Sequence, residues 1–68
     1  MSYKRLSSGN YALYLDEWNN LPSDPNYPNC KMVNNDIIED GTLLEIHDLS
    51  TGKIVMYAQA LERRWFVR

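Results

Sequence analysis

The sequence predicts a small β-rich α+β domain, and three features of the chain favour this fold class. Short runs rich in tyrosine, leucine, isoleucine and valine alternate with turn-forming residues, which is the pattern of short strands. The pattern is strongest at residues 42–48 and 53–59, which flank a Leu-Ser-Thr-Gly loop. Only residues 16–21 and 58–64 resemble a turn of helix, so strands should dominate.

The first predicted element is a hairpin. Residues 3–6 and 11–15 have strand composition, and the Ser-Ser-Gly-Asn stretch at 7–10 tolerates turn geometry. The second half of this hairpin should present alternate side chains to opposite faces of a sheet.

A single turn of helix follows over residues 16–21. Asp16 is placed to cap its N-terminus, and Trp18 and Leu21 then lie on one side. Pro22 ends the turn, because its ring fixes φ and removes a backbone donor.

Residues 20–31 hold all three prolines of the chain and its single cysteine, Cys30. Each proline pushes the preceding residue away from helical angles, so we expect a surface segment that is neither helix nor strand. The segment is long for a connection in a compact domain, which favours a binding loop. A plain crossover over one end of a sheet fits the same residues.

The second half of the chain contains the clearest strands. Residues 31–33 fit a short edge strand, and the Asp-Gly pair at 40–41 fits a turn. If Asp48 pairs with Lys53, one face of the next hairpin carries Leu44, Ile46, Val55 and Tyr57. The opposite face then carries Leu43, Glu45, His47, Ile54 and Met56, and its apolar members require cover from another element or another chain.

Residues 64–67 should form the closing strand, with Trp65 and Val67 on one face and Phe66 on the other. Five short strands interrupted by one or two helical turns predict a small five-stranded antiparallel barrel, SH3-like or OB-like. Residues 1–68 should form this barrel as one domain.

Several kinds of chemistry are excluded by the residues present. One cysteine cannot form an internal disulfide, and one cysteine with one histidine cannot make a standard zinc site. Residues 36–47 begin like a calcium loop, but Ile38 and His47 occupy positions that require oxygen ligands. No phosphate loop or nucleophile motif is present, and no spacing joins Cys30 to His47. We therefore expect no catalysis and no cofactor, and the lack of a signal peptide or membrane span favours a cytoplasmic location.

Charge is distributed unevenly along the chain, whose net charge is −2. Residues 6–52 carry eight carboxylates against Lys31, a net charge of −7, whereas the two ends carry six cations against Glu62, a net charge of +5. An acidic middle steers basic partners toward a protein.

The acidic middle predicts a protein-binding module. Tyrosine and tryptophan anchor protein interfaces, carboxylates attract a basic partner, and a proline-restricted loop loses little entropy on binding. By analogy of size and charge, the chain suits a phage or mobile-element inhibitor that blocks a basic nucleic-acid-processing partner. The predicted contact residues are Asp16, Glu17, Trp18, Asp24 and Tyr27.

Two alternatives use other residues. Arg63, Arg64 and Trp65 combine basic and aromatic character, as nucleic-acid-binding barrels do, although the pI of about 5.1 argues against this and Trp65 also suits a core. In the other alternative the chain is a structural subunit that forms a homo-oligomer through Leu43, Ile54 and Met56.

Overall fold

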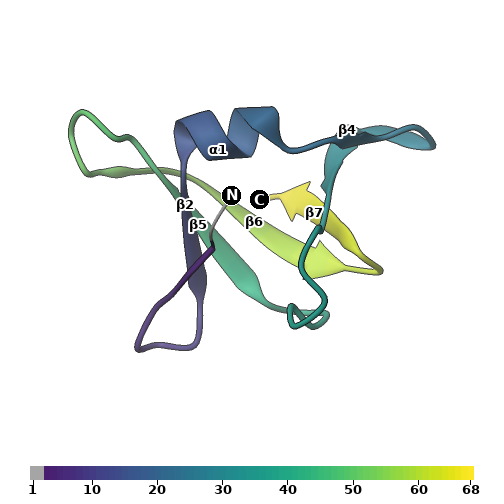
Figure 1. Ribbon diagram of the computed structural model, residues 1–68, viewed down its shortest axis with the longest axis horizontal. Helices are drawn as coiled ribbons and strands as arrows, with labels where there is room; N and C mark the ends of the chain where they lie inside the picture. The colour runs from purple at the N-terminus through teal and green to yellow at the C-terminus, as the bar shows by residue number, and fades with distance from the viewer. Residues whose placement is uncertain (1–2) are drawn as a thin grey trace.

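The computed structural model describes residues 3–68 as one mixed sheet of seven strands with a single short helix (Figure 1). The sheet order is β1-β2-β5-β6-β7-β4-β3, and every neighbouring pair is antiparallel except β2 and β5, which are parallel. The elements are β1 (Lys4–Arg5), β2 (Tyr11–Tyr14), α1 (Leu15–Asn20), β3 (Ser23–Asp24), β4 (Tyr27–Met32), β5 (Leu43–His47), β6 (Ile54–Leu61) and β7 (Arg64–Val67).

The β-rich architecture with a short helix is confirmed, whereas the five-stranded antiparallel barrel is not. Among the described residues the sheet has two ends, β1 and β3, which do not pair with each other. The parallel β2–β5 pair arises because α1 and the β3–β4 hairpin lie between these strands in sequence, so the chain returns to the sheet by a crossover.

The first hairpin forms as predicted. Lys4 pairs with Ala12 and Arg5 with Tyr11, and the loop closes through a hydrogen bond of 2.8 Å from the Leu6 N–H to the Asn10 carbonyl. Gly9 supplies the left-handed conformation of the loop, with φ of +92°.

Helix α1 begins one residue earlier than predicted. Tyr14 rather than Asp16 is the N-cap, and the Tyr14 N–H donates to the Glu17 carboxylate at 3.3 Å. The helix ends before Pro22, and the Lys31 ammonium donates to the carbonyls of Asn19 and Leu21 at 3.4 Å. A cation at this end favours the helix, because the last carbonyls carry partial negative charge.

The prediction that residues 20–31 form neither helix nor strand is wrong. They fold into the β3–β4 hairpin, whose turn places Asn26 so that its N–H donates to the Asp24 carboxylate at 2.7 Å. Asp24 pairs with Tyr27 while Ser23 pairs with Lys31, so residues 28–30 form a bulge. A bulge accepts Pro28 because its residues do not belong to the regular ladder.

The β5–β6 hairpin also forms as predicted, but its register differs. The Asp48 N–H donates to the Lys53 carbonyl at 2.8 Å as expected, yet a bulge in β6 puts Met56 opposite Ile46. Beyond the bulge, Met56 therefore faces the core, and Val55 and Tyr57 are exposed.

The predicted helical turn over 58–64 does not form. Strand β6 continues to Leu61, and Glu62 and Arg63 make a two-residue turn into β7 with φ of 52° and 66°. Two consecutive left-handed residues are typical of the type I′ turn, which matches the twist of a hairpin.

The core lies between the curled sheet and α1. Leu44, Ile46 and Trp65 are its largest fully buried side chains, and Trp18 of α1 packs against the same cluster. The Trp65 indole N–H donates to the Tyr3 hydroxyl at 3.1 Å, which joins the first described residue to the last strand.

Candidate binding surfaces

Asp24, Tyr27 and Arg64 form one compact cluster. The Arg64 guanidinium donates to the Asp24 carboxylate at 2.8 Å and lies 4.4 Å from the centre of the Tyr27 ring. The Asn26 N–H and then Arg64 hold the pKa of Asp24 below its ordinary value. The cluster thus joins two residues of the predicted acidic surface to one residue of the predicted nucleic-acid patch, and it fastens the β3–β4 hairpin to β7.

Both tryptophans lie in the core. Trp18 is 5% exposed and Trp65 is completely buried, so neither ring is accessible to a partner or to a base. Of the predicted nucleic-acid patch, Arg63 is the member that projects into solvent, and it pairs with Asp36 at 3.1 Å. The predicted patch is therefore not a continuous basic and aromatic surface.

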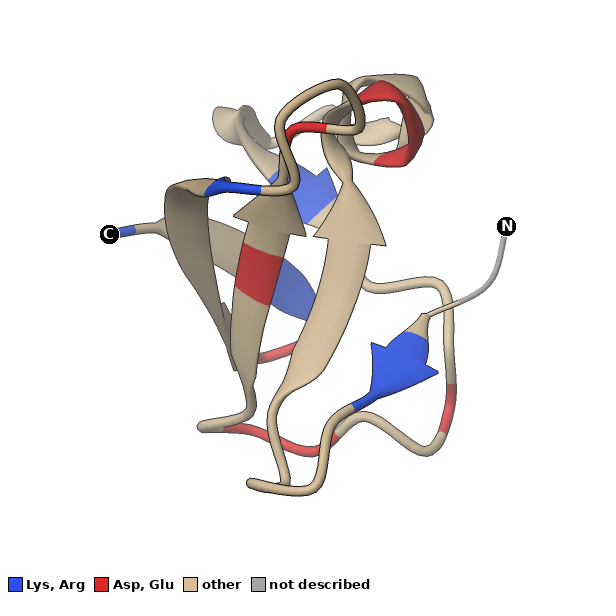
Figure 2. Cartoon of the chain, turned by 90° about the vertical axis from the view of Figure 1, so that its left-hand side faces the viewer, with Lys and Arg blue, Asp and Glu red and all other residues tan. Residues whose placement is uncertain are grey.

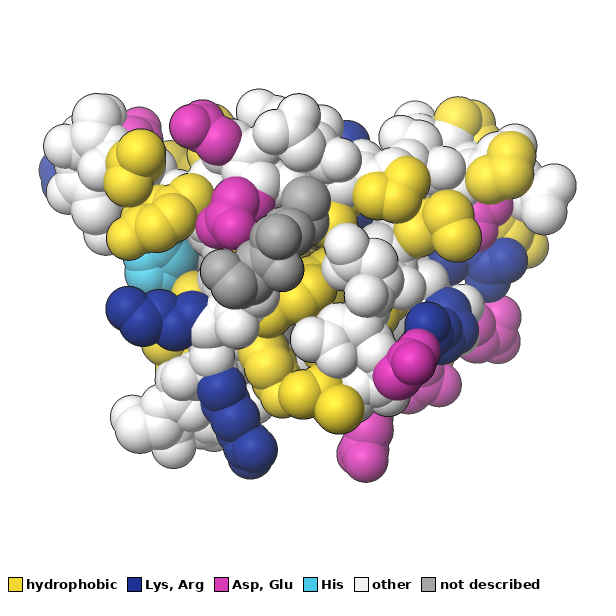
Figure 3. Space-filling view, viewed as in Figure 1, with side chains coloured by type: hydrophobic (Ala, Val, Ile, Leu, Met, Phe, Trp, Pro, Cys, Tyr) yellow, Lys and Arg dark blue, Asp and Glu magenta, His cyan; other side chains and the backbone are white. Residues whose placement is uncertain are grey.

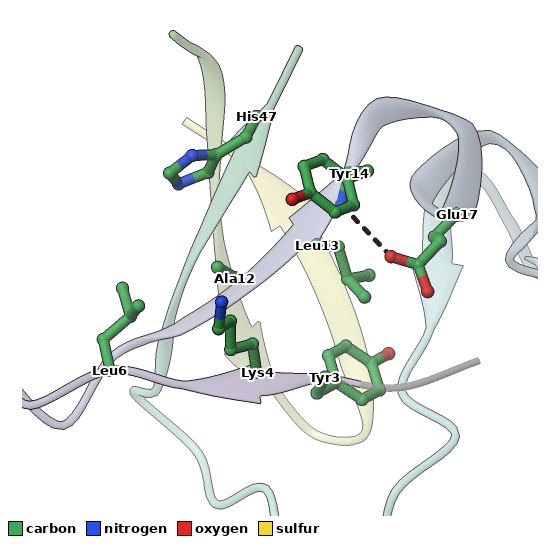
Figure 4. Close-up of a pocket in the computed structure, with 8 residues that line it drawn as sticks. All are labelled: Tyr3, Lys4, Leu6, Ala12, Leu13, Tyr14, Glu17 and His47. Carbon is green, nitrogen blue, oxygen red and sulfur yellow. Dashed lines mark hydrogen bonds between the residues drawn. The ribbon is translucent and has the colours of Figure 1, made fainter. Parts of the chain in front are cut away.

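Asp16 and Glu17 lie in the first turn of α1, and Glu17 lines a hollow of about 440 Å³ (Figure 4). Figure 4 shows that the hollow lies where β1, β2 and the end of β5 meet, with the Tyr14–Glu17 hydrogen bond at its α1 side. Its lining residues are Tyr3, Lys4, Leu6, Ala12, Leu13, Tyr14, Glu17 and His47.

The walls of the hollow differ in character. Tyr3 and Tyr14 contribute aromatic rings and Glu17 a carboxylate, whereas Lys4 and His47 contribute nitrogen groups. Burial raises the pKa of Tyr3 above 10.0, so its hydroxyl stays protonated at neutral pH. Figure 3 shows hydrophobic side chains next to the histidine and to basic side chains on this side of the molecule. The hollow thus offers apolar contact and charges of both signs.

The sheet surface that faces away from the core is a second candidate. Because side chains alternate along a strand, one set from β5, β6 and β7 points away from the buried residues Leu44, Ala58 and Trp65. Tyr57 and Phe66 are about two-fifths exposed on it. We call this surface the outer face, and it comprises Leu43, Glu45, His47, Tyr57, Gln59, Leu61, Arg64, Phe66 and Arg68.

The charged residues of the outer face lie on either side of its central strand, β6, which carries none. Figure 2 shows β2 and β6 without a charged residue, with Glu45 on β5 between them. The Glu45 carboxylate accepts a hydrogen bond of 3.0 Å from the His47 ring, and the contact is an ion pair when that ring is protonated. The trio predicted for self-assembly is split, because Met56 packs against the core while Leu43 and Ile54 lie outside it.

Residues 3–68 contain no group of three or more side chains suited to hold a metal ion, and Cys30 is buried at the β4 bulge. Of the described chain only α1 is helical, and its six residues are too few to span a membrane. Comparison of the chain with protein-family models, with curated proteins and with solved structures finds no match.

The hollow was not predicted from the sequence, and the outer face was predicted only in part, through Leu43, Glu45 and His47. The hollow is built by residues that meet through β1–β2 pairing and the parallel β2–β5 pair. The outer face was obscured by the β6 bulge, which exchanged Met56 and Tyr57 between faces. The alternation of Tyr57, Gln59 and Leu61 was a further signal of this face in the sequence.

Proposed function

We propose that the chain is a small non-catalytic protein-binding module and that a partner with a basic surface binds at the hollow. The observation that carries this proposal is the concave wall of Tyr3, Tyr14 and Glu17; the exposed Asp16 precedes Glu17 in the first turn of α1. Its volume of about 440 Å³ is large enough for one or two side chains of a partner.

An arginine or lysine side chain of the partner fits this wall. Its alkyl part contacts Tyr3 and Leu13, and its cation lies near the Tyr14 ring and the Glu17 carboxylate. Because Lys4 and His47 lie on the other side of the hollow, the cation should enter from the α1 side.

The charge distribution supports a basic partner. Asp16 is exposed in the same helical turn as Glu17, and the exposed carboxylates of Asp36, Glu39 and Asp40 add to the negative field of the molecule. Such a field raises the rate of association with a cationic surface. A protein whose basic groove normally holds nucleic acid is the kind of target that this module would block, as an inhibitor encoded by a phage or mobile element would.

The proposal is tested with defined peptides and isotope-labelled protein. In an NMR titration, an arginine-rich peptide should shift the amide resonances of residues 13–17 and 3–6, and a glutamate-rich peptide of equal length should not. Asp16→Lys should weaken binding about tenfold or more, equivalent to roughly 1.4 kcal/mol.

Glu39→Lys is the matched control, since it makes the same charge change at an exposed residue that does not line the hollow. Equal losses in both variants would show a general charge effect and would overturn the site. A single-stranded oligonucleotide in a third titration tests the nucleic-acid alternative, and binding to it with no peptide binding would replace the proposal.

A further inference from the structure

The outer face is organised in rows that run across three strands. In one row Glu45 lies opposite Tyr57, and the Arg68 N–H donates to the Tyr57 carbonyl at 2.8 Å on the other side. In the next row Leu43 pairs with Gln59, which pairs with Phe66. Adjacent strands are about 4.8 Å apart, so Glu45 and Arg68 flank Tyr57 at about 10 Å from each other.

We propose that the outer face binds the same face of a second copy of this chain, related by a two-fold axis that runs along β6. Such an axis places each β6 side chain opposite itself, so that Tyr57 meets Tyr57 and Gln59 meets Gln59. It also places β5 of one copy over β7 of the other. Glu45 of each copy then meets Arg68 of the other copy, so the contact occurs twice by symmetry.

The pattern of side chains favours a second copy over an unrelated protein. Under this operation the carboxylate of Glu45 faces a guanidinium, and Leu43 faces the exposed ring of Phe66. Within each copy Gln59 donates to the Gly41 carbonyl at 3.3 Å and accepts from the Arg68 guanidinium at 3.4 Å, so it holds Arg68 on this face. A two-fold axis across the strands would instead place Glu45 opposite Glu45, which repels.

The dimensions of the molecule are sufficient for this contact. A standard interface buries about 800 Å² on each partner. That is about a fifth of the total surface of 4568 Å², or roughly one side of a molecule of 33 × 22 × 21 Å. Two sheets that pack face to face stand about 10 Å apart, which leaves room for tyrosine side chains between them. This inference does not rest on the proposed binding of a basic partner, which uses the hollow.

Charge reversal tests the geometry. Glu45→Arg and Arg68→Glu each place like charges together in their own homodimer, so each variant alone should dimerise about tenfold more weakly or worse. In an equimolar mixture of the two variants, residue 45 of one chain meets residue 68 of the other with opposite charges at both contacts. Sedimentation equilibrium should therefore show a dimer in the mixture that neither variant forms alone.

Two further substitutions keep the test decisive if Glu45→Arg disturbs the fold. Phe66→Lys should abolish the dimer, whereas Ile37→Lys, at an exposed position outside the outer face, should leave it unchanged. Circular dichroism checks that each variant is folded. A wild-type chain that is monomeric at millimolar concentration overturns the inference, and so does a dimer that Phe66→Lys does not weaken or a mixture of charge variants that stays monomeric.

Discussion

Tyr3→Phe tests how the first described residue stabilises the core. The Trp65 indole N–H donates to the Tyr3 hydroxyl at 3.1 Å, and the Tyr3 oxygen also forms a hydrogen bond with the backbone of Asn34. The substitution keeps the ring, and with it the edge contact to Tyr11 and the tilted contact to Trp65 at centroid distances of 6.4 and 6.0 Å. Its main effect is thus to remove the acceptor.

The expected loss follows from the burial of Trp65. Because this side chain has no exposed surface, water cannot replace the missing acceptor, and an unsatisfied buried donor costs about 1–3 kcal/mol. A chain of 68 residues has a free energy of unfolding of roughly 3–10 kcal/mol, so the loss is a large fraction. In a domain of this size each kcal/mol lowers the Tm by about 4–8 °C.

Thermal and urea unfolding, followed by circular dichroism at one fixed protein concentration, measure the effect. The Trp65→Phe variant provides a second background without the indole donor, and there Tyr3→Phe should cost much less. Tyr14→Phe removes the same oxygen from an exposed ring and should stay within about 0.5 kcal/mol of wild type. A loss for Tyr3→Phe that is equal in both backgrounds, or no larger than that of Tyr14→Phe, would refute the reasoning.

Three more predictions concern stability. The folded-state pKa of Asp24 lies below its ordinary value of 3.8, so the stabilisation by this carboxylate is complete above about pH 3.8 and is lost as the pH falls through the folded pKa. Arg64→Met should reduce this acid-dependent loss of Tm, measured from pH 6 to pH 2. A pH profile of Tm that is unchanged in the variant would contradict this prediction. Ile46→Val removes a methylene from a fully buried side chain and should cost about 0.5–1.5 kcal/mol in urea unfolding, whereas no cost would show a loosely packed core. Replacing both turn residues, by Glu62→Asn with Arg63→Gly, should raise the Tm by a few degrees, because left-handed backbone costs non-glycine residues about 1–2 kcal/mol each; a lower Tm would contradict the turn assignment.

Local patterns were sufficient to predict the hairpins. Alternating apolar residues and a glycine in the loop identified the first hairpin and the β5–β6 hairpin, because pairing between neighbouring strands depends on nearby residues. The helical turn was also found from the spacing of Trp18 and Leu21. Each of these elements is stabilised mainly by residues that are close to one another in sequence.

Prolines and bulges account for most of the errors in the fold. Three prolines argued against strands in residues 20–31, but one lies in the turn and Pro28 lies in a bulge, where no ladder hydrogen bond is required of it. The bulge at Val55 shifted the register of β6 by one residue, and no residue type marks such a shift in advance. The parallel β2–β5 pair joins strands about thirty residues apart and left no local signal.

The candidate sites were harder to predict than the fold. Asp24 and Arg64 are 40 residues apart in sequence, so their ion pair could not be read from spacing, and they were assigned to two different surfaces. Trp18 and Trp65 were treated as anchors because of their residue type, but the same large apolar rings fill the core. Glu17 lines a concave surface, which depends on β1 and β5 as much as on α1.

The meeting of Tyr3 with Trp65 also bears on the order in which the chain folds. Strands β5, β6 and β7 are consecutive and pair through short loops, so they can form early at a small entropic cost. The N-terminal hairpin reaches the core only by closing a loop of some sixty residues, which places its docking late. Substitutions around Tyr3 should therefore accelerate unfolding and leave the rate of folding nearly unchanged, whereas substitutions in β6 should slow folding.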